Sequence, residues 1–177
     1  MSGRKWILIV FFAFIGMNLL ANEQGFTFKP LFGGGGGTAV FDGVGGYGLG
    51  GMGEFLFLFY DSGLQISSHI IGRGDSITTD TGINYGTGSI LGKLSFGGFL
   101  PNNIFRSYGF VEGGVGFGGG NGTSTSNILF GGGGGIDLFF HQKGSLYLEV
   151  GYLQHYLDNT LIGGVSISIG SRGWLFK

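Results

Sequence analysis

Two short runs of alternating residues decide the fold, SLYLEVGY at positions 145–152 and VSISI at positions 165–169. In the first run Leu146, Leu148 and Val150 share one side, whereas Glu149 lies on the other. In the second run valine and isoleucine share one side and two serines share the other. A period of two residues is typical of a β-strand whose two faces meet different surroundings. The sequence therefore predicts strands that each have one apolar face.

The same alternation recurs between turn-forming residues and predicts about eight strands. The expected strands are Phe26–Phe41, Tyr47–Tyr60, Leu64–Arg73, Ile83–Phe99, Phe105–Gly118, Ile128–Phe140, Ser145–Tyr156 and Leu161–Gly170. Tight turns are expected at Asp61–Gly63, Pro101–Asn103 and His141–Gly144, and longer polar loops at Gly74–Gly82 and Gly119–Asn127. Tight turns that alternate with longer loops are typical of outer-membrane barrels.

Composition narrows the class of protein. Of the 177 residues 43 are glycine, 16 % are aromatic and only 11 % are charged, with a mean hydropathy of +0.34. Two prolines exclude collagen, and the aromatic content is too high for a disordered glycine-rich linker. The chain has no cysteine and therefore no disulfide or thiolate metal site. Nine Lys and Arg against ten Asp and Glu leave no basic surface for nucleic acid.

Residues 1–21 are predicted to be a cleaved signal peptide. Arg4 and Lys5 precede the apolar stretch Trp6–Ile15, and a cleavage site follows at Ala21. The apolar stretch is too short for a membrane-spanning helix, which needs roughly 20 residues. The expected organisation is a signal peptide at 1–21 and one barrel domain at 22–177, exported to the outer membrane of a diderm bacterium.

The face opposite the apolar one separates a soluble sandwich from a membrane barrel. It carries glycine, serine and isolated charges, which are too few for a surface in water. The apolar face is large, and only lipid or a second sheet could cover it. The signal peptide, the lack of cysteine and the even number of strands favour lipid. We expect an all-β fold, a transmembrane antiparallel up-and-down barrel of eight strands, with a soluble secreted domain as the minor alternative.

Four segments resemble the outer-membrane β-barrel superfamily that includes the OmpA transmembrane domain, OmpX and OmpW. They are Tyr108–Gly114, Gly132–Asp137, Leu148–Tyr152 and Gly163–Ile167. This family usually ends its last strand on an aromatic residue that the assembly machinery reads, whereas here Lys177 follows Phe176. The resemblance implies outer-membrane lipid and the barrel-assembly machinery as partners.

Charged residues at inward positions form the first candidate site. By strand parity they are Lys29, Glu54, Arg73, Lys93, Arg106, Glu112, Asp137 and Glu149. The interior of an eight-stranded barrel is just wide enough for side chains, so charges there must be paired. The favoured interpretation is a stabilising network of ion pairs, and the alternative is a gated path for protons or ions.

Glycines on the same inner face form the second candidate site. They are Gly33, Gly35, Gly37, Gly48, Gly50, Gly114, Gly116, Gly118, Gly131, Gly133 and Gly135. They predict either a vestibule that opens to the exterior above a plug of charges, or the sharp coiling of a narrow barrel. The two interpretations differ in the free volume above the charges.

Two motifs that could carry chemistry are rejected. Gly46–Gly51 matches a dinucleotide fingerprint, but this spacing arises by chance in so glycine-rich a chain. His155 lies in a segment similar to the His-x-Ser-Asn region of lipid A 3-O-deacylase barrels, yet Leu157 occupies the position of the serine nucleophile. We therefore predict no catalytic, cofactor-binding or metal-binding residue.

These observations predict a non-enzymatic integral outer-membrane protein, a monomer that contributes to envelope integrity or surface contact. A small passive channel or binding barrel for modest or hydrophobic solutes, resembling the OmpW type, is the second hypothesis. An outer-membrane lipid-modifying enzyme is the third and least favoured. The sequence identifies no surface partner.

Overall fold

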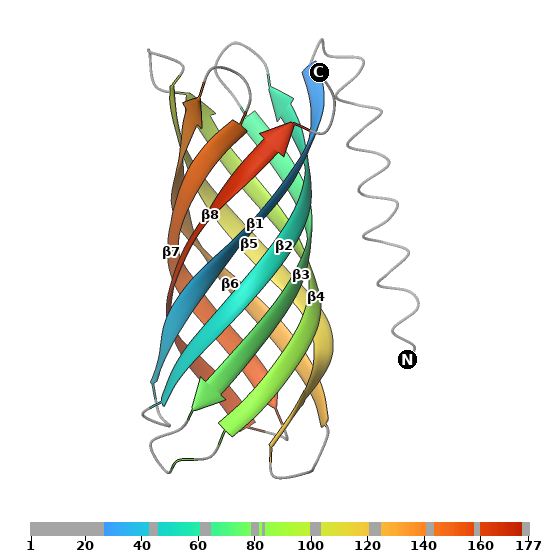
Figure 1. The fold of residues 1–177 in the computed structure, drawn as a ribbon, viewed down its shortest axis with the longest axis vertical. Coiled ribbons are helices and arrows are strands. Elements are labelled where there is room, and N and C mark those ends of the chain that lie inside the picture. The colour runs from blue at the N-terminus through green and yellow to red at the C-terminus, as the bar shows by residue number, and fades with distance from the viewer. Residues whose placement is uncertain are drawn as a thin grey trace.

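The computed structural model describes residues 27–42, 46–60, 65–78, 82, 84–99, 104–120, 125–140, 144–157 and 160–174. The predicted signal peptide lies outside these residues. The strands are β1 (Thr27–Asp42), β2 (Gly46–Tyr60), β3 (Gln65–Thr78), β4 (Asn84–Phe99), β5 (Phe105–Gly119), β6 (Thr125–Phe140), β7 (Gly144–Leu157) and β8 (Thr160–Trp174). Each strand pairs antiparallel with the next, and β8 pairs with β1 to close a barrel (Figure 1). Within the described part of the chain, no helix is long and apolar enough to cross a membrane.

The pairing register sets the shape of the barrel. Following paired residues around the barrel from Leu31 leads back to β1 at Phe41, ten residues farther along (41 − 31 = 10). Such an offset tilts the strands by about 35–45° to the barrel axis, and Figure 1 shows this slant. β8 ends where β1 begins, and we name this the terminal end and the opposite one the far end.

The eight predicted strands are confirmed in number and order, and three of them are longer than predicted by three residues or more. β3 continues to Thr78, β6 begins at Thr125, and β8 continues to Trp174. The predicted loops at Gly74–Gly82 and Gly119–Asn127 are therefore too long. Pairing with the neighbouring strand, rather than local composition, carries these polar residues into the sheet.

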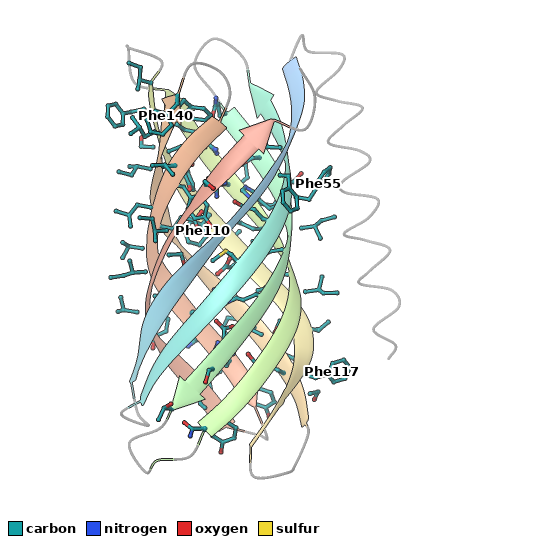
Figure 2. The ribbon with its side chains drawn as sticks, viewed as in Figure 1. Phe55, Phe110, Phe117 and Phe140 are labelled. Carbon is teal, nitrogen blue, oxygen red and sulfur yellow. The ribbon has the colours of Figure 1, made fainter. Side chains whose placement is uncertain are left out.

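The predicted alternation of faces is confirmed in β8. Val165, Ile167 and Ile169 are 46–63 % exposed on the outside, whereas Ser166 and Ser168 are buried inside. Figure 2 shows apolar side chains projecting outward around the described wall of the barrel. The outer face is therefore apolar, and the inner face carries the polar side chains.

A small aliphatic core fills the middle of the interior. Ile71, Leu91, Leu129 and Leu153 are at most 2 % exposed and pack together, with Met52 against them. On its own strand, each of the four lies farther from the terminal end than the charged or ionisable inward residues at 69, 93, 137 and 149. The interior thus has two layers, with polar groups toward the terminal end and aliphatic side chains beyond them.

Candidate functional site

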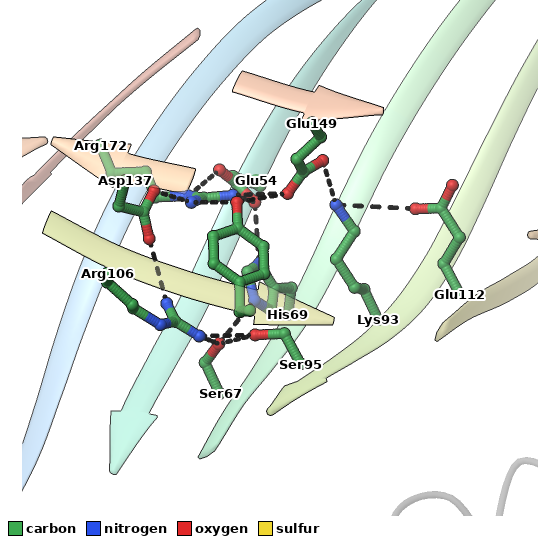
Figure 3. Close-up of polar contacts among 11 residues, drawn as sticks. Glu54, Ser67, His69, Lys93, Ser95, Arg106, Glu112, Asp137, Glu149 and Arg172 are labelled. Atoms are coloured by element: carbon green, nitrogen blue, oxygen red, sulfur yellow. Dashed lines mark hydrogen bonds and ion pairs between the residues drawn. The ribbon is translucent and has the colours of Figure 1, made fainter. Parts of the chain in front are cut away.

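Charged side chains from seven strands meet in the terminal half of the interior (Figure 3). We name this cluster the ion network. Its members are Glu54, His69, Lys93, Arg106, Glu112, Asp137, Glu149 and Arg172, hydrogen-bonded to Ser67, Ser95 and Tyr108. No cluster of this kind survives without pairing, because the loss of water around each charge costs several kcal/mol.

Arg172 is the centre of the ion network. Its Nε donates to Glu54 at 2.6 Å, its Nη2 donates to Glu149 at 3.1 Å, and its Nη1 donates to Asp137. The guanidinium carbon lies 4.0 Å from the centre of the Tyr147 ring, a distance at which the ring face attracts a cation. One cation thereby joins carboxylates from three strands.

Arg106 forms a second centre next to the first. Its Nη1 donates to Asp137 at 3.1 Å, so Asp137 bridges two guanidinium groups. Its Nη2 donates to Ser67 at 3.1 Å and to Ser95 at 2.8 Å. The guanidinium also lies over the Tyr108 ring, 4.4 Å from its centre. Both terminal nitrogens of this cation are therefore occupied by partners, whereas its Nε is buried without a hydrogen-bond partner.

Lys93 extends the ion network toward the middle of the barrel. Its ammonium donates to Glu149 at 2.7 Å and lies 3.7 Å from a carboxylate oxygen of Glu112. It also lies 4.5 Å from the centre of the Phe110 ring. Lys93 thus faces two carboxylates at different heights in the barrel.

His69 links the carboxylates to a pair of serines. Its Nδ1 is 2.8 Å from Glu54 and its Nε2 is 2.9 Å from the hydroxyl of Ser67. Ser67 in turn contacts the hydroxyl of Ser95. All four side chains are at most 3 % exposed.

The structure brings six of the eight predicted inward charges into the ion network. They are Glu54, Lys93, Arg106, Glu112, Asp137 and Glu149. Arg73 pairs instead with Asp75 on its own strand at 2.8 Å, farther from the terminal end. The side chain of Lys29 lies outside the described residues.

Arg172 and His69 are the important members that sequence reasoning missed. The eighth strand was predicted to end at Gly170, so Arg172 was not assigned to the inner or the outer face. His69 is two and four residues from the inward positions Ser67 and Arg73, and strand parity could have assigned it to the interior. A lone histidine offered no visible partner, because its partner Glu54 comes from the neighbouring strand.

The predicted vestibule glycines nearest the terminal end face the ion network. A Cβ added at Gly33 would meet the Arg172 side chain at 2.9 Å, and one at Gly135 would meet the Tyr108 ring at 2.6 Å. A Cβ at Gly35 would overlap the Tyr147 hydroxyl. These glycines therefore make room for large side chains and do not lie above the charges, which corrects the vestibule interpretation for them.

The glycines toward the far end are also in tight surroundings. An added Cβ at Gly114, Gly116, Gly131 or Gly133 would come within 2.8 Å of, or overlap, a backbone carbonyl oxygen of the neighbouring strand. At Gly37 and Gly50 it would meet Ser168 and Asp75, and Gly118 is buried. The inner side of Gly48 lies outside the described residues. At the described positions the geometry matches the alternative interpretation, the close coiling of a narrow barrel.

Among the residues that the structure describes, no group of three His, Cys, Asp or Glu could hold a metal ion. Each carboxylate of the ion network pairs with at least one basic side chain, and aromatic rings lie against the cations. Chemically it can close the interior to water and ions.

No protein-family model matches the chain, and no curated protein matches its sequence. Among solved structures, Neisserial surface protein A is 14 % identical, with a TM-score of 0.52 over 84 % of this chain and 98 % of its own. At this identity the likeness shows a shared fold, and the expectation of a closed antiparallel barrel of eight strands is confirmed.

Two further structures are similar at lower scores. Ail, the attachment invasion locus protein of Yersinia pestis, in complex with a heparin analogue, is 14 % identical, with a TM-score of 0.48 over 82 % of this chain and 97 % of its own. The outer membrane protein OprG from Pseudomonas aeruginosa is 9 % identical, with a TM-score of 0.48 over 86 % of this chain and 98 % of its own.

Replacing Arg172 by leucine should destabilise the barrel strongly. The variant keeps three buried carboxylates without the cation that joins them, and we expect the free energy of unfolding to fall by about 3–5 kcal/mol. Arg73→Leu is the matched control, because it leaves only Asp75 without its partner and should cost less. Equilibrium unfolding in urea measures both values, and equal losses in the two variants would contradict the central role of Arg172.

Proposed function

We propose that the chain is a non-enzymatic, monomeric integral outer-membrane barrel that contributes to envelope integrity. The observation that carries this proposal is the inverted polarity of the two faces. Ile169 is 63 % exposed on the outer face, whereas the side chain of Arg172 is 2 % exposed inside. Apolar surface in water costs about 25 cal/mol per Å², and lipid removes that cost.

The size of the barrel supports a membrane location. Strands of 14–16 residues, tilted as described, span about 35 Å along the axis. Transmembrane barrels need an apolar band roughly 25 Å tall with aromatic residues at both borders. Phe55 and Phe140 project outward toward the terminal end and Phe117 projects outward toward the far end (Figure 2), as such borders require.

The orientation of the barrel in the membrane follows from the predicted signal peptide. With residues 1–21 removed in the periplasm, the terminal end faces the periplasm and the far end faces the exterior. The strand bounds leave only residues 43–45, 79–83, 120–124 and 158–159 between strands at the far end. Such short connections offer little surface to a partner, which favours envelope integrity over surface contact. Outer-membrane lipid and the barrel-assembly machinery are the partners that this proposal requires.

The lipid-facing assignment predicts a dependence on depth along β8. Ile167 is near the middle of this strand and Leu161 is its second residue, and they are 46 % and 52 % exposed on the same face. Ile167→Arg should lower the free energy of unfolding in lipid vesicles by about 2–4 kcal/mol, and Leu161→Arg by ~0–1 kcal/mol. Equal effects of the two substitutions would argue against a membrane around this face.

One observation favours a second function, a gated path for ions. Lys93 is 2.7 Å from Glu149 and 3.7 Å from Glu112, so its ammonium could pass from one carboxylate to the other by a small movement of its side chain. Such an exchange would be a first step in opening the ion network. The aliphatic core beyond Lys93 would also have to move, and this makes the closed barrel the favoured reading.

Recordings in planar bilayers distinguish the two functions. The refolded protein should show no stable unitary conductance, because both layers of the interior are filled. A unitary conductance that Lys93→Met alters would instead establish the gated path.

A further inference from the structure

Glycines also lie on the outer face of the barrel, where crowding does not require them. An added Cβ at Gly53, Gly72, Gly86 or Gly88 would meet nothing within 4 Å, and one at Gly74 would come only to 3.8 Å from the nearest atom. These open surroundings contrast with those of the inward glycines, and none of the five positions has a positive φ. Packing within the chain therefore does not explain the outward glycines.

The outward glycines of three neighbouring strands are in register and form one continuous surface. Gly53 of β2 pairs with Gly72 of β3, and Gly51 pairs with Gly74, which pairs in turn with Gly88 of β4. We name this surface the glycine trough, and its floor consists of Gly51, Gly53, Gly72, Gly74, Gly86 and Gly88. Three adjacent strands thus present bare backbone on the face where β8 carries valine and isoleucine.

Apolar side chains border the glycine trough on the β5 side. Phe117 lies opposite Gly88, and Val115 lies opposite Ile90 of β4. With 65–75 % of their surface exposed, Phe117, Ile90 and Val115 are the most exposed large apolar side chains in the described part of the chain. Phe117 projects outward toward the far end (Figure 2). The glycine trough is therefore a groove with a bare floor and an apolar border.

A hollow of about 600 Å³ lies in the far half of the glycine trough. Its lining includes Gly51, Gly74, Ser76, Gly86 and Thr87. Sites for small ligands have volumes of roughly 300–1,000 Å³, so the hollow is large enough for one. Thr87 is only 8 % exposed, yet its hydroxyl has no hydrogen-bond partner among the described residues.

Polar groups follow the glycine trough at its far end. Ser76 is exposed beside the hollow, and beyond it the hydroxyl of Thr78 donates to the side-chain oxygen of Asn84 at 2.7 Å. The floor itself carries no side chain. A ligand that matches this order is apolar along most of its length and polar at the end that lies toward the exterior.

We propose that the glycine trough binds an acyl chain of a lipid in the outer leaflet, with the polar head of that lipid at Ser76, Thr78 and Asn84. This site rests on the membrane location and the orientation proposed above. Within a bilayer the hydrophobic effect does not hold apolar groups together, so retention depends on close van der Waals contact. Glycine permits such contact, because a straight saturated chain can lie directly on the backbone. A chain held there exchanges more slowly than lipid around the rest of the barrel.

The size of the glycine trough favours a lipid over a second copy of the chain. Stable protein–protein interfaces bury about 800 Å² and roughly 20–30 residues on each partner. The floor of the trough has six glycines, and the residues named at its border and far end are uncharged. The trough therefore offers neither the area nor the charges that would fix a protein partner, whereas it matches the narrow apolar shape of an acyl chain.

Lipid retention tests this site in the full chain, refolded in detergent that contains dipalmitoyl phosphatidylcholine. Native mass spectrometry should show a retained lipid on the barrel after the detergent is removed. Gly74→Phe should lower the retained fraction several-fold, because its ring occupies the floor on which the acyl chain lies. Gly134→Phe is the matched control, since Gly134 is an exposed glycine of β6 whose added Cβ comes no closer than 3.5 Å to another atom. This control should retain as much lipid as the unchanged chain.

Insertion into lipid vesicles, measured on the same proteins, separates this site from the proposed function. If the unchanged chain and the control do not insert, the membrane location fails and the lipid site fails with it. If all the proteins insert, equal retention by Gly74→Phe and Gly134→Phe, or no retention by the unchanged chain, overturns the lipid site alone. A mass of two chains that Gly74→Phe abolishes would also overturn it, because the glycine trough would then hold a second copy.

Discussion

The structure depends on one ion cluster, in which Arg172 joins three carboxylates away from water. Each partner of this arginine comes from a different strand, so the contact requires the closed barrel and in turn holds its strands together. Removing Arg172 leaves these carboxylates without the cation that they share, in a medium that solvates charges poorly. The ion pairs therefore depend on one another, and all strands that carry them must be in place at the same time.

The glycines beside the ion network follow from this condition. Long arginine and tyrosine side chains must share an interior that is barely wide enough for side chains. Gly33 lies against Arg172 and Gly135 lies against Tyr108, so positions without a Cβ supply the space that the ion network occupies. Toward the far end the glycines instead allow neighbouring backbones to approach closely. The large polar cluster thus fits inside the barrel because glycines in the surrounding wall leave space for its side chains.

Strand parity was sufficient to predict the barrel and the inward direction of six network charges. It failed at residues 171–174, where serine and glycine occupy the outward positions and no apolar alternation marks a strand. Pairing of Arg172 with Gly33, far apart in sequence, extends β8 through this segment. The hydrogen bond between His69 and Glu54 was hidden for the same reason, because the register between β2 and β3 places Glu54 opposite Ile71 and diagonal to His69. The two-residue alternation along a strand assigns each side chain to a face, but it does not show which residues of neighbouring strands are in contact.

Spin labels along β8 test most directly whether lipid lies outside the barrel and a closed, filled interior lies inside. The chain has no cysteine, so single cysteines can be introduced at positions 165–169 and labelled in the protein refolded in vesicles. We predict that oxygen dissolved in lipid reaches the labels at 165, 167 and 169. The labels at 166 and 168 should be shielded from both oxygen and a water-soluble nickel complex. Free access of the nickel complex to positions 166 and 168 would show a water-filled interior and contradict this account.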